Sequence, residues 1–204
     1  ANVHEINPHL GKAITEEHML SDVRMLKAGN FNAVRNCHYP HHPRWYELCD
    51  EHGLYVVDEA NIETHGFVEN GALSLLACDP AWAAQYLHRV QNMFNRAKNH
   101  ACVITWSLGN ESGWGPNFEA CAKWLRAADW QHRPIQYEGA AANGDAVLLF
   151  GDGQGRMSDI VCPMYASPPQ IAALAAAAAD GGAEERPIVL CEYSHALGNS
   201  SGSL

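Results

Sequence analysis

The sequence predicts an α/β fold, namely a partial (β/α)8 barrel with about seven βα units present and its last strand missing. Short apolar runs alternate with helical patterns along the chain. The ends of successive runs are mostly about 24 to 30 residues apart, close to the roughly 31 residues of one unit in a barrel of about 250 residues. Nearly every run ends in polar residues, which is where barrels carry their functional sites. We expect one domain over residues 1–204, incomplete at both ends.

The expected strands are brief and mostly apolar, as is typical of parallel strands that are buried on both faces. They are residues 1–4, Asn32–Arg35, Tyr55–Glu59, Val103–Leu108, Ile135–Glu138, Ile160–Met164 and Ile188–Glu192. An open, doubly wound sheet is the alternative architecture. Such a sheet usually has a glycine-rich phosphate loop after its first strand, and the sequence contains neither a GxGxxG nor a GxxxxGK pattern. The barrel is therefore preferred.

Capping residues mark the expected helices. Thr15 precedes two glutamates and Gly29 closes the same segment, which predicts a helix between them. An aspartate followed by proline, Asp79-Pro80, marks the start of another helix. The remaining helices are expected over Pro43–Glu51, Asn117–Ala128 and Pro169–Ala179, with Gly53 closing the first and Gly181-Gly182 closing the last.

Composition and charge exclude several classes of protein. The chain has 204 residues, 47% of them hydrophobic, and its formal net charge is −10. This acidic balance argues against a nucleic-acid partner, and no apolar run is long enough for a membrane span. The seven cysteines are odd in number and form no CxxC pair, so a disulfide framework and a zinc ribbon both fit poorly. Free thiols indicate a reducing compartment, and we expect a cytoplasmic protein.

Polar and ionisable residues follow strand after strand, which random placement would not produce. In a barrel these positions converge on one face, and acidic and imidazole groups gathered there indicate acid–base chemistry, a metal, or both. The residues concerned are Arg35, His38, Asp58, Glu59, Glu63, His65, Asn110, Glu111, Tyr137, Glu138, Tyr165, Glu192 and His195.

Two of these residues, Glu111 and Glu192, each follow an apolar strand. Glycoside hydrolysis needs two such carboxyl groups, one to protonate the leaving oxygen and one to attack the anomeric carbon or activate water. The structural alternative for Glu111 is a loop carboxylate that caps the next helix. That alternative weakens once both glutamates are considered together.

The segment Asp58–Gly66 is dense in metal-ligating residue types. A hard cation such as Mg²⁺ prefers carboxylate oxygens, and histidine can join its ligands. For Asp58 and Glu59 we prefer an ion pair with Arg35 or another neighbouring base. For Glu63 and His65 the sequence leaves metal binding and a structural role equally open.

Five segments together resemble the catalytic barrel of glycoside hydrolase family 2, specifically the large bacterial β-galactosidases of the lactose-hydrolysing type. The resemblance extends from about residue 2 to residue 199. It is carried by the strings NCHYPHHPRWYELCDEHGLYVVDEANIETHG, VITWSLGNESGWG, RPIQYEG, DIVCPMYA and RPIVLCEYSHALGNS. The residues around both glutamates are of the galactosidase kind.

The resemblance implies a retaining mechanism in which Glu111 is the general acid/base and Glu192 the nucleophile, assisted by Tyr165. It implies that a Mg²⁺ ion is held by Glu63, His65 and Glu111. It also implies sugar contacts from His4, His38, Asn110 and His195. In the full-length family a Na⁺ site and most of the oligomer interface lie in parts that are not in this sequence, so the parent protein is expected to be a homo-oligomer. Its substrate would be a small β-galactoside such as lactose, without a nucleic-acid or membrane partner.

Two other interpretations remain open. The chain could be a catalytically inactive barrel remnant that retains at most carbohydrate binding. It could also be a metal-dependent hydrolase built on the histidine-rich loops. The second alternative predicts a site with histidine ligands in the majority and no need for Glu192.

Overall fold

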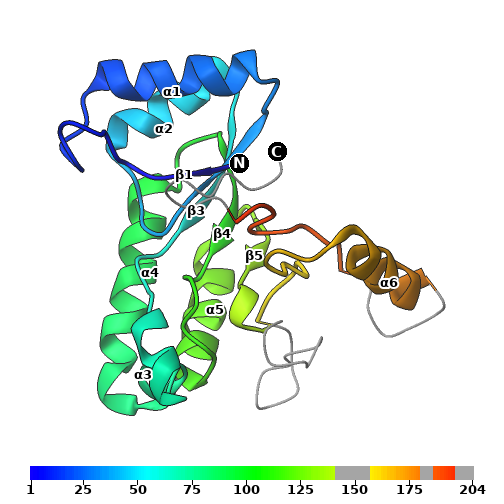
Figure 1. Ribbon diagram of the computed structural model, residues 1–204. Helices are drawn as coiled ribbons and strands as arrows, with labels where there is room; N and C mark the ends of the chain where they lie inside the picture. Colours follow the sequence, from blue (N-terminus) through cyan, green and yellow to red (C-terminus); the bar gives the residue numbers. More distant parts are fainter. Residues whose placement is uncertain (141–156, 180–185, 196–204) are drawn as a thin grey trace.

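A parallel five-stranded sheet forms the centre of the computed structural model, which describes residues 1–140, 157–179 and 186–195 (Figure 1). Its order, β1-β2-β3-β4-β5, follows the order of the chain, so every connection is a crossover, as in the wall of a barrel. The strands are β1 (Asn2–Val3), β2 (Ala33–Asn36), β3 (Tyr55–Glu59), β4 (Val103–Ser107) and β5 (Ile135–Gln136). The predicted further strand at residues 1–4 is therefore confirmed.

Helices fill the connections between these strands. They are α1 (Glu16–Ala28), α2 (Pro43–His52), α3 (Leu75–Cys78), α4 (Ala83–Ala97), α5 (Pro116–Ala128) and α6 (Pro168–Ala179), with 3₁₀ turns η1 (His65–Asn70), η2 (Pro80–Trp82) and η3 (Glu138–Ala140). Helix α1 packs on α2 and α4 packs on α5, whereas α6 lies apart from both pairs (Figure 1). None of the described helices is long and apolar enough to cross a membrane.

The predicted caps are confirmed where the structure describes them. Thr15 is the N-cap of α1, and Asp79 caps the turn that leads into α4 by accepting a hydrogen bond from the Ala81 amide at 2.9 Å. Gly53 ends α2 with φ 69°, a left-handed conformation that glycine adopts without steric cost. The predicted stop at Gly181-Gly182 lies outside the described residues.

Two predicted strands are shorter than the sequence indicated. Residues 160–164 and 188–192 form only isolated parallel pairings, Val161 with Ile188 and Met164 with Glu192. Pro163 lies between the two pairings, and because proline has no N–H it removes one hydrogen bond from any ladder there. Similarly, β5 stops at Gln136, and Glu138 begins a 3₁₀ turn instead of ending a strand.

The core lies between the sheet and the helices. Tyr86, Val90 and Phe94 on α4 are buried, as their spacing of four residues predicts. Trp106 on β4 is fully buried against Phe94, with the ring centroids 5.5 Å apart. Trp82 lies four residues before Tyr86, but it precedes α4 in the 3₁₀ turn and is 41% exposed, so it is not part of the buried face of this helix.

Asp129 anchors the C-terminal end of α5 to the core. Its carboxylate accepts hydrogen bonds from the Trp106 indole at 2.9 Å and from the Arg133 Nε at 2.8 Å. The Arg133 guanidinium also lies over the Trp106 ring, 4.4 Å from its centroid. Burial alone would raise the pKa of Asp129, but the hydrogen bonds from Arg133 and Trp106 and the Arg133 charge lower that pKa to about 2.

Replacing Asp129 with asparagine is expected to lower the free energy of unfolding by about 2 kcal/mol at pH 7. The pKa of this carboxylate is lower in the folded state than in the unfolded state. Its stabilisation is therefore present above about pH 4 and is lost as the pH falls toward 2. Urea unfolding of both proteins at pH 7 and pH 3 measures the difference, which should shrink at pH 3. An equal difference at both pH values would contradict an electrostatic origin.

Candidate active site

The carboxyl ends of β2, β3 and β4 meet at one edge of the sheet because these strands are parallel neighbours. Glu59, at the end of β3, is fully buried there and accepts three hydrogen bonds. They come from Arg35 Nε at 2.7 Å, Ser107 Oγ at 2.6 Å and His38 Nδ1 at 2.8 Å. The preferred ion pair between Glu59 and Arg35 is thus confirmed, and Glu59 fixes the orientation of the residues around it.

Asp58 behaves differently from its neighbour. Its Oδ1 accepts hydrogen bonds from the Asn36 amide at 2.9 Å and the Tyr46 hydroxyl at 2.7 Å, and it forms no ion pair with Arg35. Successive strand residues point to opposite faces, so Asp58 and Glu59 cannot share one partner. Burial raises the pKa of Asp58 to about 6 despite these hydrogen bonds. Among the described residues Asp58 forms no ion pair with any other base either, so the preferred ion pair with Arg35 or another neighbouring base is wrong for Asp58.

Arg35 connects the two parts of the site. Besides Glu59, its guanidinium donates from Nη2 to Asn110 Oδ1 at 2.9 Å and from Nη1 to Glu192 Oε1 at 2.9 Å. Only 4% of Arg35 is exposed. A planar guanidinium with several N–H donors suits this role, because one side chain reaches three acceptors in fixed directions. It therefore holds the strand-end residues Asn110 and Glu192 at the same edge.

Glu192 lies between two hydrogen-bond donors. Its Oε1 accepts from Arg35, and its Oε2 accepts a short hydrogen bond from the Tyr165 hydroxyl. Burial pushes the pKa of Glu192 upward, but these two donors and the positive charge of Arg35 outweigh burial and lower it. These contacts therefore favour the ionised form of the Glu192 carboxylate.

Glu111 lies just beyond β4. Its backbone N–H donates to the buried carboxyl group of Glu138, and its Oε2 accepts from the Asn110 amide at 3.3 Å. Burial, and then the nearby charge of Glu59, raise the pKa of Glu138 to about 7. The backbone φ angles of Glu111 and Tyr165 are 37° and 54°, in the left-handed region that side chains other than glycine seldom adopt. Both positions carry backbone strain, which is common at functional sites.

The three histidines expected to contact sugar lie in two places. His4 and His38 are neighbours, with ring centroids 5.3 Å apart. His195 lies instead beside Tyr165, with ring centroids 5.1 Å apart. Burial tends to lower the pKa of His38, but the hydrogen bond and charge of Glu59 raise it overall. The pKa of His4 is lowered, first by burial and then by the neighbouring His38.

Two of the three residues expected to bind Mg²⁺, His65 and Glu111, approach one another, whereas Glu63 is linked to them only through the backbone. His65 Nε2 lies 3.8 Å from Glu111 Oε1, and Glu63 forms a parallel backbone bridge with Asn110, the neighbour of Glu111. Within the described chain, these three side chains are not drawn together as tightly as a compact metal cluster. Two carboxylates and one imidazole, partly open to solvent, nevertheless fit a hard cation that retains several water ligands.

A cleft with a volume of about 350 Å³ opens at this edge. Its lining contains the side chains of His65, Glu111, Glu138 and Met164. Tyr165 lines an adjoining hollow together with Pro163 and Met164. A sugar-sized molecule placed here would meet carboxyl groups and apolar surface together.

Sequence reasoning placed the strand-end residues at one edge but missed two roles. Arg35 was expected only as an ion-pair partner, whereas it joins Glu59, Asn110 and Glu192. Glu138 was expected only as one of several polar residues at strand ends, whereas its carboxyl group accepts a hydrogen bond from the Glu111 backbone. The signal for both was their position at the ends of strands predicted from the sequence.

Comparison with known proteins agrees with this fold. The family model "Glycosyl hydrolases family 2, TIM barrel domain" matches residues 1–204. The chain therefore belongs to glycoside hydrolase family 2 and forms its TIM-barrel domain. The family and the fold predicted from the sequence are both confirmed.

The related sequences carry a particular name within that family. The chain is 49% identical to the β-galactosidase of Vibrio cholerae serotype O1 over 209 residues, which cover 99% of this chain and 19% of that protein. It is also 49% identical to the β-galactosidase of Alteromonas mediterranea, again over 99% of this chain and 19% of the relative. The chain thus spans about a fifth of the length of these relatives.

Solved structures support the fold. The β-glucuronidase of Ruminococcus gnavus in complex with C6-substituted uronic isofagomine superimposes with a TM-score of 0.70 at 23% identity, covering 95% of this chain and 34% of that one. The β-glucuronidase of Bifidobacterium dentium complexed with coumarin-3-O-glucuronide gives a TM-score of 0.66 at 20% identity, with 98% and 34% covered. At this identity the likeness concerns the architecture alone.

Proposed function

We propose that this chain supplies the catalytic centre of a retaining β-galactosidase that removes terminal β-D-galactose from galactosides such as lactose. The observation that supports this most directly is the Arg35 guanidinium, which binds both Glu192 and the neighbour of Glu111, Asn110. Two carboxyl groups at strand ends of one barrel are thereby held on the same edge. Glycoside hydrolases use two carboxyl groups on one face in this way, and the retaining mechanism proposed here needs them about 5–5.5 Å apart.

In the proposed mechanism, Glu192 attacks the anomeric carbon while Glu111 gives its proton to the departing glycosidic oxygen. A covalent galactosyl-enzyme forms. Glu111 then takes a proton from water, which attacks the same carbon and releases Glu192. The Tyr165 hydroxyl and Arg35 keep Glu192 ionised before attack and stabilise it as a leaving group.

The other residues orient the sugar in this proposal. Asn110 would bind the 2-hydroxyl, and His4, His38 and His195 would bind further hydroxyls. Hydrogen bonds to such hydroxyls strengthen as positive charge develops on the ring. Glu63, His65 and Glu111 would hold Mg²⁺, which would add positive charge beside the acid/base residue.

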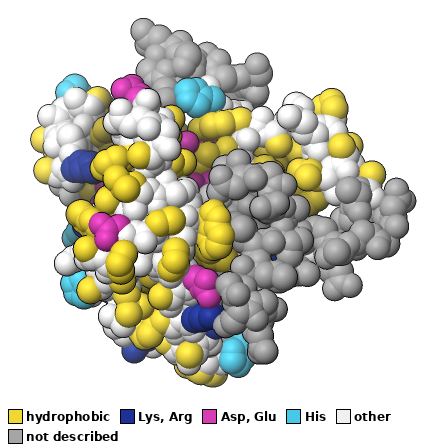
Figure 2. Space-filling model, turned by 90° about the horizontal axis from the view of Figure 1, so that it is seen from below, with side chains coloured by type: hydrophobic (Ala, Val, Ile, Leu, Met, Phe, Trp, Pro, Cys, Tyr) yellow, Lys and Arg dark blue, Asp and Glu magenta, His cyan; other side chains and the backbone are white. Residues whose placement is uncertain are grey.

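The whole protein is proposed to act in the cytoplasm as a homo-oligomer on small galactosides, with neither a nucleic-acid nor a membrane partner. Among the described residues all seven cysteines are free thiols, in keeping with a reducing compartment. Apolar side chains are spread over the described part of the face shown in Figure 2, with charged side chains scattered among them. Trp130 is 80% exposed and Ile6 is 68% exposed. Such side chains suit contacts with other parts of the assembly.

Hydrolysis of a chromogenic β-galactoside by the 204-residue chain, with Mg²⁺ and then with a chelator, tests the proposal. We expect turnover that falls when the ion is removed. A chromogenic β-glucuronide serves as the control substrate and should not be cleaved. The same assay is made on the whole protein that contains this chain; if a folded sample of it cleaved neither substrate, the barrel would be an inactive remnant. Activity independent of Glu192 would instead favour a metal-dependent hydrolase.

A further inference from the structure

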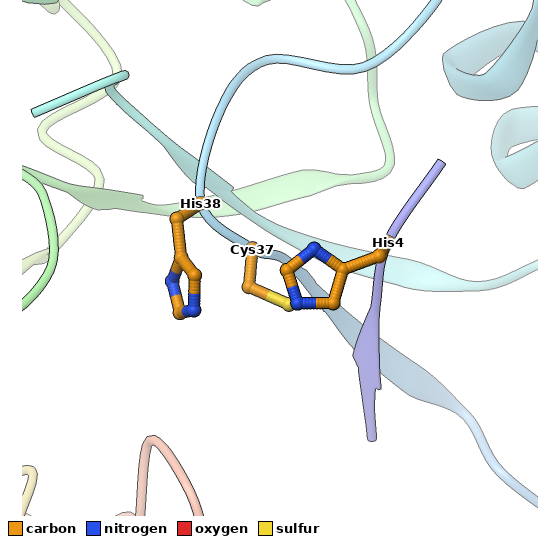
Figure 3. A group of neighbouring side chains, drawn as sticks. All are labelled: His4, Cys37 and His38. Carbon is orange, nitrogen blue, oxygen red and sulfur yellow. The ribbon is translucent and has the colours of Figure 1, made fainter. Parts of the chain in front are cut away.

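A second group of metal-ligating side chains lies beside the candidate active site. His4 follows β1, and Cys37 and His38 follow β2, which pairs with β1 in parallel. One ligand atom from each of the three residues lies within 4.8 Å of the other two. Figure 3 shows the Cys37 side chain between the two imidazole rings, with the His4 ring next to its sulfur. We propose that His4, Cys37 and His38 bind a divalent ion that prefers nitrogen and sulfur ligands, with Zn²⁺ as the example.

The chemistry of the three ligand atoms determines which class of ion this site prefers. Two imidazole nitrogens and one thiolate are ligands typical of zinc, whereas Mg²⁺ prefers oxygen. Ligand atoms around tetrahedral zinc lie roughly 3.5 Å apart, because each is about 2.0 to 2.3 Å from the ion. The ligand atoms, which lie within 4.8 Å of one another, must therefore close by at most about 1.3 Å. His4 is exposed, so rotation of its side chain supplies this movement.

His38 is already oriented for such a role. Its Nδ1 forms a 2.8 Å hydrogen bond with Glu59, which is fully buried and held by Arg35. This leaves Nε2, which lies 3.9 Å from Glu192 Oε1, as the nitrogen that would bind the ion. A histidine whose second nitrogen bonds to a carboxylate is the usual arrangement at metal sites, since the carboxylate fixes the ring and makes it a better ligand.

Cys37 and His4 supply the other two ligands. Cys37 is 1% exposed, and its thiol donates to the Val3 carbonyl at 3.3 Å. When the ion binds, the covalent S–H bond of Cys37 is replaced by a sulfur–metal bond, and the proton passes to solvent. The His4 ring contacts the rings of His38 and Tyr39, but within the described residues no hydrogen bond engages its nitrogens, so binding breaks no hydrogen bond there.

A comparable cluster elsewhere in the chain serves as an internal control. Asp50, His100 and Cys102 also lie within ligand distance of one another. There, however, Asp50 already receives hydrogen bonds from His100 Nδ1 and from the Cys102 amide, both at 2.7 Å. An ion would have to break these interactions. We therefore expect no binding at this second cluster.

Binding of the ion does not rest on the proposed function, but its consequence for hydrolysis does. An ion held by His4 and His38 would occupy two imidazoles that are proposed to contact the sugar. Zinc and a galactoside would then compete for the same residues.

Titration of the chain with Co²⁺ tests the site directly, because a cobalt–thiolate bond produces a charge-transfer absorption band. We expect the band to saturate at one ion per chain and to disappear when Zn²⁺ is added, but not when Mg²⁺ is added. The band should be lost in Cys37→Ser and retained in Cys102→Ser. Circular dichroism of both variants verifies folding.

A second variant keeps the test decisive if Cys37→Ser does not fold. His4→Ala removes an exposed ligand and should weaken Co²⁺ binding at least tenfold. Absence of the band in the unaltered chain would overturn the proposal. So would a band that persists in folded Cys37→Ser, or unchanged affinity in His4→Ala. None of these readouts depends on glycosidase activity, so failure here leaves the proposed function standing.

Discussion

Replacing Glu192 with glutamine in the full-length protein is expected to reduce kcat for β-galactosides by at least about 10³-fold. An amide cannot attack the anomeric carbon, so the covalent intermediate does not form. The fold should change little, because Arg35 retains Glu59 as its partner and the glutamine still accepts from Tyr165. Steady-state hydrolysis of a chromogenic galactoside measures the loss, and the temperature midpoint of unfolding verifies the fold.

Two further variants show whether the loss of activity is specific to Glu192 and whether Glu111 acts as the acid. Glu47→Gln changes an exposed carboxylate on α2 and should retain full activity. Glu111→Gln should slow substrates with poor leaving groups most, because only they depend on protonation of the departing oxygen. Normal hydrolysis by Glu192→Gln would show that the nucleophile is another residue. Equal losses for good and poor leaving groups in Glu111→Gln would argue against its acid role.

Replacing Arg35 with leucine is expected to have the largest effect on stability. The substitution leaves Glu59 fully buried without its cation, and breaking a buried pair in this way costs about 3 to 5 kcal/mol. Activity should be lost as well, because Asn110 and Glu192 lose their common donor. Urea unfolding and galactoside hydrolysis measure the two losses.

Arg35→Lys separates these effects. Lysine restores a positive charge near Glu59 but lacks the planar fork that reaches three acceptors. We expect most of the stability to return while kcat stays at least about tenfold below that of the unaltered protein. Arg44, which pairs with three exposed glutamates on the surface, is the matched control. Arg44→Leu should change stability far less than Arg35→Leu. Equal losses would contradict the role of burial.

The sequence was sufficient for the elements whose signals are local. Thr15, Gly29 and Gly53 mark the ends of their helices as predicted, because capping depends on a few adjacent residues. The two last strands were over-predicted. Their apolar residues satisfied the pattern for a strand, but pairing also needs N–H groups, and Pro163 has none.

The site was predictable in its location but not in its connections. Parallel strands bring their carboxyl ends to one edge, so the strand-end residues could be named from the sequence. The other two partners of Arg35, Asn110 and Glu192, could not be named, because they lie 75 and 157 residues away. Whether Asp58 or Glu59 faces Arg35 depends on which side of β3 each occupies, which only the sheet register decides.

Selection for thermal robustness alone would work against the proposed chemistry of this chain. Glu111 and Tyr165 hold backbone angles that glycine adopts freely and other residues adopt at a cost of order 1 kcal/mol or more. Laboratory evolution toward a more stable barrel would therefore favour replacing Glu111 and Tyr165 with glycine, since either substitution relieves backbone strain. A library designed for industrial durability should keep positions 111 and 165 fixed and seek its gains elsewhere in the barrel.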